Sequence, residues 1–305
     1  MKISVIGAGA LGKTYGGLLS FNNEVHFLVR SDYLAMKRDG FTLHFAQKEK
    51  NLEINTDFIH ESPHSLVPSD LIIISLKTTE NKALPKLLKH CLKSDSLILI
   101  IQNGIGNEEW VSQIAPNNEI VCGISSMGAY REGKTLVQIP IIGELKLANF
   151  NSENGCDKIQ ALFEKAPIII PTKIFSSYKE IRWKKLLWNV PFSSLSIIYK
   201  QDACTLATKS PYVSIVQTVM HEIIEVAHTQ GITITQDDVS KMLALTSGFK
   251  DYYPSMFRDY FDGKPIEKEY IIDNVLNIAK AHHIHTPMLN MISSHLAHVL
   301  PHGKR

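Results

Sequence analysis

The chain has 305 residues, of which 44% are hydrophobic and 20% are charged, and its formal net charge is only +2. This length can bury large cores and favours two domains, and the balance of 32 basic and 30 acidic residues leaves no basic stripe typical of nucleic-acid binding. No stretch approaches the roughly 20 apolar residues of a membrane span, and the N-terminus resembles a strand instead of a signal sequence. We therefore expect a cytoplasmic protein that binds neither membranes nor nucleic acids.

The first element is an apolar strand at residues 2–6, followed by a glycine-rich turn and a helix over residues 13–21. The turn has the pattern Gly-x-Gly-x-x-Gly and comprises Gly7, Ala8, Gly9, Ala10, Leu11 and Gly12. The first glycine of this pattern permits a tight turn, the second lets the backbone approach a pyrophosphate, and the third lets the helix pack on the strand. With a strand before it and a helix after it, the motif predicts a dinucleotide-binding site.

The second strand, residues 24–29, ends at Arg30 about 20 residues beyond the glycines. A site that prefers NAD places Asp or Glu here to bind the ribose hydroxyls. Arg30 and Ser31 instead offer a cation and a hydroxyl, and Asp32 lies too far along to be the obvious ribose partner. We predict NADP(H), with Arg30 near the 2′-phosphate; the alternative is that Arg30 is a solvated strand-end residue.

Further short apolar runs follow at residues 70–76, 96–102 and 119–123, separated by helical or loop segments. This alternation predicts βαβ units and a doubly wound parallel sheet of the Rossmann type. Residues 134–149 and 167–174 are predicted as additional strands, some of them antiparallel. We expect this α/β domain to span residues 1–175.

Two strand ends carry polar residues where open α/β sheets bind their ligands. Lys77 follows the run at residues 70–76, and Asn103 follows the run at residues 96–102. Lys77 could meet a phosphate or a substrate charge, and the Asn103 amide could bind the nicotinamide carboxamide or substrate oxygens. Either residue could instead cap a turn, because Asn-Gly is a common turn pair.

From about residue 176 the apolar pattern becomes helical, which predicts an all-helical second domain over residues 176–305. Ser210-Pro211 and Thr286-Pro287 resemble helix starts, and Gly231 resembles a helix stop. The expected helices cover residues 178–199, 211–230, 236–245, 267–282 and 287–300, and Pro191 is expected to bend or end the first of them.

The first of these helices contains a candidate general acid. Lys185 and Asn189 are four residues apart and therefore share one face. A lysine in a cleft of low dielectric constant loses proton affinity, which suits proton donation near neutral pH. Lys184 stands beside it, and the pattern alone leaves open which lysine points inward. Further on, Glu267 is expected to open a helix, where a carboxylate also suits the helix dipole.

The cysteines and histidines of the chain do not predict a metal site. The four cysteines are far apart and form no CxxC pair, so they are expected to be core residues in a reducing compartment. His298 and His302 are spaced i, i+4, but Pro301 interrupts the helix between them and no carboxylate accompanies them. The cysteines are Cys91, Cys122, Cys156 and Cys204.

Several motifs together resemble the ketopantoate reductases over nearly the whole chain. They are GAGALG at residues 7–12, the strand ending at Arg30, SLK at 75–77, QNGIG at 102–106, RWKKLLWN at 182–189, PSMFRD at 254–259 followed by Glu267, and the HIHTP segment at 283–287. The resemblance implies reduction of 2-dehydropantoate to pantoate by NADPH, in the route to pantothenate and coenzyme A.

The resemblance also implies roles for individual residues. Lys185 would be the general acid, and Glu267 would assist it and contact the cofactor. Lys77, Asn103 and Ala129 would line the cofactor or its nicotinamide end. We expect Asn103, Asn189 and Ser255, with Lys185, to bind the substrate's carboxylate and hydroxyl groups.

Departures from the family pattern concern the substrate pocket. Ser193, Ala203 and Tyr252 stand where the family, or some of its members, have asparagine. The loss of amide contacts favours, as an alternative, a related 2-keto acid that is bulkier or less hydroxylated. A different two-domain dehydrogenase and a non-catalytic NADP sensor also stay open, and the apolar helical half could form a homodimer.

Overall fold

The computed structural model describes residues 1–298, which form two compact units. The first unit comprises Met1–Gln102 and Asn107–Tyr178, and the second comprises Asn103–Gly106 and the chain from Lys179 onward. The segment Asn103–Gly106, which the sequence prediction places in the first domain, thus packs with the second unit. The predicted fold class, a doubly wound sheet followed by a helical part, is confirmed.

The main sheet of the first unit has the strand order β12-β11-β8-β7-β6-β1-β2-β5. All neighbours pair in parallel except β8 and β11, which pair antiparallel as predicted for the end of the sheet. Side chains such as Ile72 and Ile73 are fully buried on opposite faces, which explains the uninterrupted apolar runs. The strands are β1 (Lys2–Ile6), β2 (Glu24–Leu28), β5 (Ile59–His60), β6 (Leu71–Ile74), β7 (Leu97–Ile100), β8 (Glu119–Ser125), β11 (Leu145–Asn149) and β12 (Thr172–Phe175).

A second, four-stranded sheet has the order β4-β3-β10-β9 and was only partly predicted. The expected strand region 134–149 divides into β10 of this sheet and β11 of the main sheet, while β3, β4 and β9 were missed. In β3, Phe41, Leu43 and Phe45 are buried and alternate with Thr42 and His44, so one face joins the core. The strands are β3 (Phe41–Phe45), β4 (Lys50–Ile54), β9 (Gly128–Glu132) and β10 (Leu136–Ile141).

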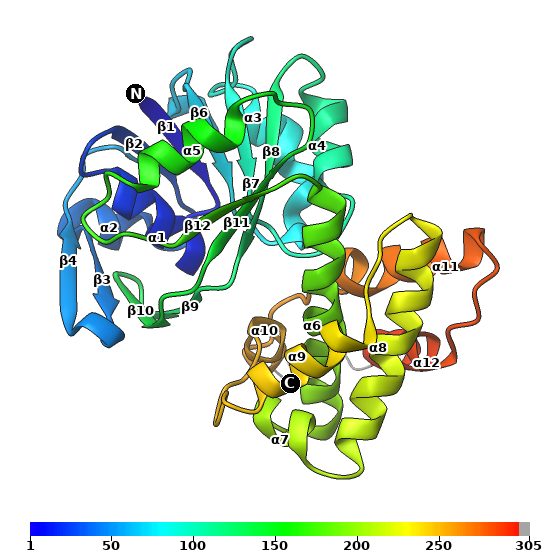
Figure 1. Ribbon diagram of the computed structural model, residues 1–305. Coiled ribbons are helices and arrows are strands. Elements are labelled where there is room, and N and C mark those ends of the chain that lie inside the picture. The colour runs from blue at the N-terminus through cyan, green and yellow to red at the C-terminus, as the bar shows by residue number, and fades with distance from the viewer. Residues whose placement is uncertain (299–305) are drawn as a thin grey trace. The chain divides into compact units, whose positions relative to one another are not determined.

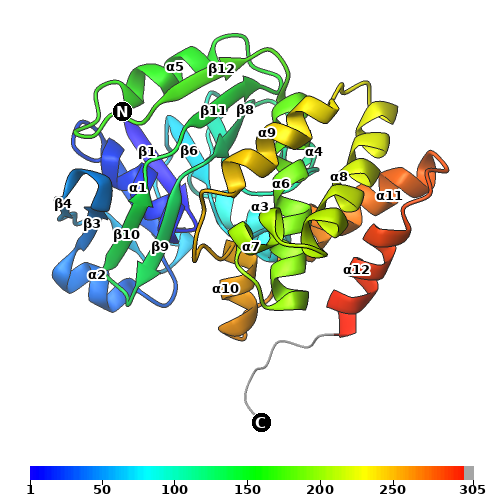
Figure 2. The same cartoon turned by 60° about the horizontal axis from the view of Figure 1, so that its bottom comes forward.

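Helix α1 (Ala10–Leu19) packs against strands of both sheets (Figures 1 and 2). A Cβ atom at Gly16 would lie 2.6 Å from the Phe27 ring, and one at Gly17 would lie 3.0 Å from Leu43. Glycine at these positions therefore lets the helix approach both sides closely. The other helices of this unit are α2 (Tyr33–Asp39), α3 (Leu84–Leu88), α4 (Asn107–Ile114) and α5 (Gly155–Phe163), with short 3-10 helices at Ala46–Lys48, Pro63–Ser65 and Thr78–Ala83.

The second unit is helical, and its longest helix, α6 (Tyr178–Tyr199), continues through Pro191. Of the two expected effects of Pro191, a bend or an end of the helix, the end does not occur. Proline removes one backbone hydrogen bond, but Val190 and Phe192 beside it are fully buried, and this packing outweighs the loss. The remaining helices are α7 (Ala203–Thr208), α8 (Tyr212–Thr229), α9 (Gln236–Thr246), α10 (Ser255–Phe261), a π-helical turn (Glu269–Asp273), α11 (Asn274–Ala281) and α12 (Pro287–His298).

Three helix boundaries in this unit refine the sequence prediction. Glu267 precedes the helix it was expected to open and accepts a hydrogen bond from the Ile271 amide through its backbone carbonyl. Pro211 occupies the position before α8, not its first turn, whereas Pro287 begins α12 as predicted. The last two residues of the predicted final helix, 299 and 300, lie outside the described residues.

Glu222 of α8 holds the start of α12 in place. Its carboxylate is buried and accepts hydrogen bonds from the amides of Met288 and Leu289, both at 2.8 Å. The first N–H groups of a helix have no partner within that helix, so this carboxylate caps α12 from a neighbouring helix.

We predict that Glu222→Gln lowers the free energy of unfolding by about 2 kcal/mol, because the carboxamide can accept only one of the two charge-assisted bonds. Urea denaturation followed by circular dichroism measures the change. Glu225→Gln, on the exposed side of the same helix, is the control and should change stability by less than about 0.5 kcal/mol. Equal effects of the two variants would contradict the capping role.

Candidate functional site

The glycine-rich turn joins β1 to α1 with the geometry that its spacing predicts. Gly7 has φ +96°, and a Cβ atom there would lie 2.3 Å from the Leu76 amide nitrogen. A Cβ atom at Gly12 would lie 2.4 Å from the Gly7 carbonyl oxygen, whereas one at Gly9 meets nothing within 4 Å. The backbone is therefore packed on one side and open at Gly9, where a ligand can approach.

The start of α1 suits an anion. Within the described chain no side chain caps this helix start, and its first turn contains no acidic residue. The first amide groups of the helix thus stay available, and they carry the positive end of the helix dipole. Together with the open space at Gly9, these features fit the pyrophosphate of a nicotinamide dinucleotide.

The loop after β2 places Arg30 at the surface and buries Asp32. The Arg30 side chain is 87% exposed, and its Nη1 lies 3.7 Å from Glu80 Oε1. Asp32 accepts hydrogen bonds from Lys13 Nζ at 2.8 Å, from Arg131 Nη1 at 2.6 Å and from the Ser31 hydroxyl at 3.0 Å. Its carboxylate is therefore occupied by protein donors and is not presented to a ribose.

This cluster corrects one expectation and adds two residues. The Ser31 hydroxyl, expected to suit a 2′-phosphate, donates its hydrogen to Asp32. Sequence reasoning missed Lys13 and Arg131, because a lysine in an amphipathic helix and an arginine in a polar hairpin have no local signal for such a contact.

The ends of β6 and β7 are joined by amide side chains. Gln102 donates to the Leu76 carbonyl at 2.8 Å and to Asn81 Oδ1 at 2.7 Å, and Asn81 in turn donates to Asn107 at 3.0 Å. Lys77 lies beside this network at the start of the 3-10 helix Thr78–Ala83. Ala129 lies in β9 and packs against the core of the first unit.

The other predicted site residues belong to the second unit, where Asn103 and Asn189 meet. Asn189 is 4% exposed, and its amide nitrogen donates to Asn103 Oδ1 at 3.3 Å. The segment after Asn103 is fixed on the π-helical turn: Gly104 has φ +86°, and the Ile105 amide donates to the Tyr270 carbonyl at 3.0 Å. Asn103 therefore contacts the helix that carries Lys185.

The structure distinguishes the two adjacent lysines. Lys184 Nζ forms an ion pair with Glu180 at 2.8 Å and a longer one with Asp238 at 3.8 Å. Lys185 Nζ instead lies 5.3 Å from the centroid of the Trp188 ring, a cation–π contact on the side of α6 that carries Asn189. The ion pairs hold the pKa of Lys184 above its usual range, chiefly through the hydrogen bond to Glu180. Lys184 therefore makes the contacts of a surface lysine.

Trp188 belongs to an aromatic group near the altered pocket positions. Its ring centroid lies 5.4 Å from that of Phe192 and 6.2 Å from that of Tyr252, and its indole N–H donates to Thr246 at 3.1 Å. Ser193 is 4% exposed and Ala203 is fully buried, and the Ala203 amide donates to the Tyr252 carbonyl at 3.0 Å.

Glu267 and Ser255 lie in different environments. Glu267 is 2% exposed and immediately precedes the helical segment that begins at Lys268. Ser255 is exposed at the first position of α10.

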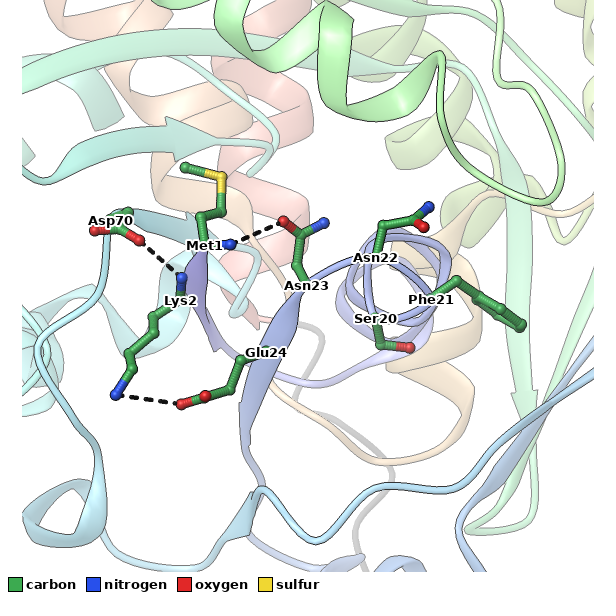
Figure 3. Close-up of a pocket in the computed structure, with 8 residues that line it drawn as sticks. All are labelled: Met1, Lys2, Ser20, Phe21, Asn22, Asn23, Glu24 and Asp70. Atoms are coloured by element: carbon green, nitrogen blue, oxygen red, sulfur yellow. Dashed lines mark hydrogen bonds and ion pairs between the residues drawn. The ribbon is translucent and has the colours of Figure 1, made fainter.

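A hollow lies at the amino ends of β1 and β2, away from the strand ends that carry the predicted site (Figure 3). The Lys2 amide donates to Asp70 at 2.8 Å, the Lys2 side chain pairs with Glu24 at 3.4 Å, and the Met1 amino group donates to Asn23 at 3.4 Å. These polar groups bind one another across an open surface, and no predicted site residue lines the hollow.

Residues 1–298 contain no group of three or more metal-ligating side chains and no helix long and apolar enough to cross a membrane. His302, which is spaced i, i+4 from His298, lies outside the described residues.

A glycine-rich turn between β1 and α1 of a doubly wound sheet is the arrangement of dinucleotide-binding proteins, and here a helical unit follows it. Residues 3–152 match the family model for the ketopantoate reductases PanE/ApbA, and residues 177–299 match the model for their C-terminal part. The chain belongs to the ketopantoate reductase family. It is an oxidoreductase that acts on a keto or CH–OH group, in a family that uses NADPH.

Individual relatives cover nearly the whole chain. A 2-dehydropantoate 2-reductase of Nostoc sp. is 29% identical over 95% of this chain and 92% of its own length. The crystal structure of 2-dehydropantoate 2-reductase from Geobacter metallireducens superposes with a TM-score of 0.91 at 28% identity, covering 97% of this chain and 99% of that one. A D-mandelate dehydrogenase bound to NADH and anilino(oxo)acetate has the same fold, with a TM-score of 0.87 at 22% identity over 98% of each chain.

We predict that Gly9→Ala changes the free energy of unfolding by less than about 1 kcal/mol. The added Cβ meets no atom within 4 Å, and the remaining cost is that alanine is less favourable than glycine at the position before a helix. The dissociation constant for NADPH should nevertheless rise at least about tenfold, because the methyl group fills the space that the pyrophosphate needs. Thermal unfolding and a fluorescence titration with NADPH measure the two effects.

Gly12→Ala is the matched variant and should destabilise the fold itself, because its Cβ would lie 2.4 Å from a backbone oxygen. If Gly9→Ala binds NADPH as tightly as the unaltered protein, the turn does not bind the pyrophosphate.

Proposed function

We propose that this protein reduces 2-dehydropantoate to pantoate with NADPH, as a cytoplasmic enzyme of pantothenate and coenzyme A synthesis. The observation that carries the proposal is the difference in contacts between the adjacent lysines of α6. Lys184 is bound by acidic residues, whereas Lys185 lies against an indole ring on the side of the helix where Asn189 contacts Asn103. Curated relatives named 2-dehydropantoate 2-reductase support the choice of substrate.

Residues of the first unit would bind the cofactor. The backbone of the Gly7–Gly12 turn would bind the pyrophosphate, Arg30 the 2′-phosphate, and Lys77 and Ala129 would line the remaining cofactor surface. Asn103 and Glu267 of the second unit are proposed as further cofactor contacts. When bound, NADPH would supply the hydride for the keto carbon.

Residues of the second unit would provide the proton and bind the substrate. Lys185 would donate a proton to the carbonyl oxygen as negative charge develops there, and Glu267 would orient this lysine. Asn103, Asn189 and Ser255 would donate hydrogen bonds to the substrate's carboxylate and hydroxyl oxygens. Asn189 is already fixed by its bond to Asn103, so its amide is oriented before substrate binds.

A second candidate substrate is a 2-keto acid with a larger apolar group. The Trp188 ring lies against Lys185, and the rings of Phe192 and Tyr252 lie near Trp188. Ser193 replaces an asparagine of the family pattern. Fewer amides and more aromatic surface favour a less hydroxylated ligand.

We also propose that the protein forms a homodimer through the helical unit. Light scattering of the purified protein tests this proposal.

We predict that Lys185→Ala lowers kcat for 2-dehydropantoate by about 10² to 10⁴, because the proton donor is lost. The NADPH dissociation constant should change less than about twofold. Lys184→Ala is the matched control. It removes an adjacent lysine whose charge is paired with Glu180, so kcat should be retained. Steady-state oxidation of NADPH measures turnover.

A panel containing 2-dehydropantoate, phenylglyoxylate and 2-oxoisovalerate separates the candidate substrates. Highest kcat/KM for phenylglyoxylate would favour the second candidate. Tight NADPH binding without turnover of any panel member would favour a cofactor sensor, and equal activity of Lys185→Ala and the unaltered protein would overturn the role of the lysine.

A further inference from the structure

Asp32 lies two residues beyond Arg30 in the loop after β2, and its oxygens are already bound by donors of the protein. Oδ2 accepts from Lys13 at 2.8 Å and from Arg131 at 2.6 Å, and Oδ1 accepts from Ser31 at 3.0 Å. The residue is 4% exposed, so water replaces little of this binding. The carboxylate therefore binds cations of the protein in place of ribose hydroxyls.

The cluster carries excess positive charge. Lys13 and Arg131 contribute two cations and Asp32 one anion, and Lys13 is fully buried. Burial alone would raise the pKa of Asp32, but the hydrogen bond and charge of Lys13, with the charge of Arg131, bring it below its usual value. Asp32 thus stays ionised and fixes both cations.

Arg131 reaches this position because the β9–β10 hairpin packs against α1 (Figure 2). Lys13 Nζ, from the first turns of α1, also donates to the backbone carbonyl of Lys134 in the same hairpin. Lys13 therefore ties the hairpin both directly and through Asp32 to the helix that follows the glycine turn.

Arg131 has donors left over. Its side chain is 33% exposed, and only Nη1 is hydrogen-bonded to a described residue. A guanidinium that is fixed at one nitrogen and partly exposed at the others is suited to bind a phosphate oxygen, because its planar donor array matches phosphate geometry. Arg30, whose sequence position first indicated NADP, belongs to the same loop as Asp32.

We propose that Arg131 is a second cation of the 2′-phosphate subsite and that Asp32 is its anchor, so that the hairpin contributes to the preference for NADPH over NADH. The inference rests on the proposed use of NADPH but not on the substrate or on Lys185. Asp32, held by Lys13, thereby acts as a positioning residue for a phosphate-binding arginine.

The test measures dissociation constants of NADPH and NADH, by fluorescence titration without any keto acid, for the full chain and for Arg131→Met. We expect the variant to bind NADPH about tenfold more weakly and NADH within about twofold of the unaltered protein, because only NADPH carries the 2′-phosphate. Arg131→Lys should recover part of the NADPH affinity, since it restores the charge but not the planar array.

Arg38→Met is the matched control. Arg38 is an exposed arginine of the same unit that pairs with Asp39 at 2.6 Å, so this variant loses the same charge elsewhere. Both constants should stay within about twofold. Thermal unfolding of each variant identifies any loss of folded protein.

Two results would overturn the inference: unchanged NADPH affinity in Arg131→Met, or equal weakening for NADPH and NADH, which would make the ion pair a purely structural link between hairpin and helix. The same data test the proposed use of NADPH separately. That proposal is wrong if the unaltered protein does not bind NADPH more tightly than NADH. If the unaltered protein prefers NADPH and only Arg30→Met removes the preference, the cofactor proposal stands and Arg131 has no part in it.

Discussion

The close approach of α1 to the strands around it is the constraint on which the first unit depends. Gly12 packs against the glycine turn. The absence of a side chain at Gly16 leaves room for Phe27 of the main sheet, and at Gly17 for Leu43 of the small sheet. A larger side chain at any of these positions would push the helix outward and change the spacing of the turn. The same close approach buries Lys13, which can be accommodated only because Asp32 compensates its charge.

In the second unit, α6 has the corresponding role. Its length and its burial around Pro191 fix the direction in which residues of its first half project. Neighbouring lysines on such a helix point about 100° apart, so one can meet Glu180 and the other Trp188. Two residues of identical chemistry thereby acquire different surroundings.

The sequence pattern predicted those features that depend on local periodicity. The runs at β1, β6 and β7 are continuous and apolar because both sheet faces are covered, and the glycine spacing requires only neighbouring residues. The strands β3 and β4 were missed because they are half polar, and β3 also pairs with β10 from a distant part of the chain. The link from Arg131 to Asp32 spans 99 positions and left no local signal. The helix continues through Pro191 because of the packing around that residue, which propensity rules omit.

Because the segment Asn103–Gly106 belongs to the second unit, the two units cannot be encoded as two consecutive, uninterrupted stretches of sequence. The chain leaves the first unit after Gln102, returns at Asn107, and leaves again after Tyr178. If the chain were divided once, near residue 178, this segment would remain with the first unit. It would then lose its hydrogen bonds to the Asn189 amide and the Tyr270 carbonyl. Chimaeras between relatives with one crossover at that point would pair a segment from one parent with helices from another. Successful recombination requires that residues 103–106 be inherited together with the helical unit.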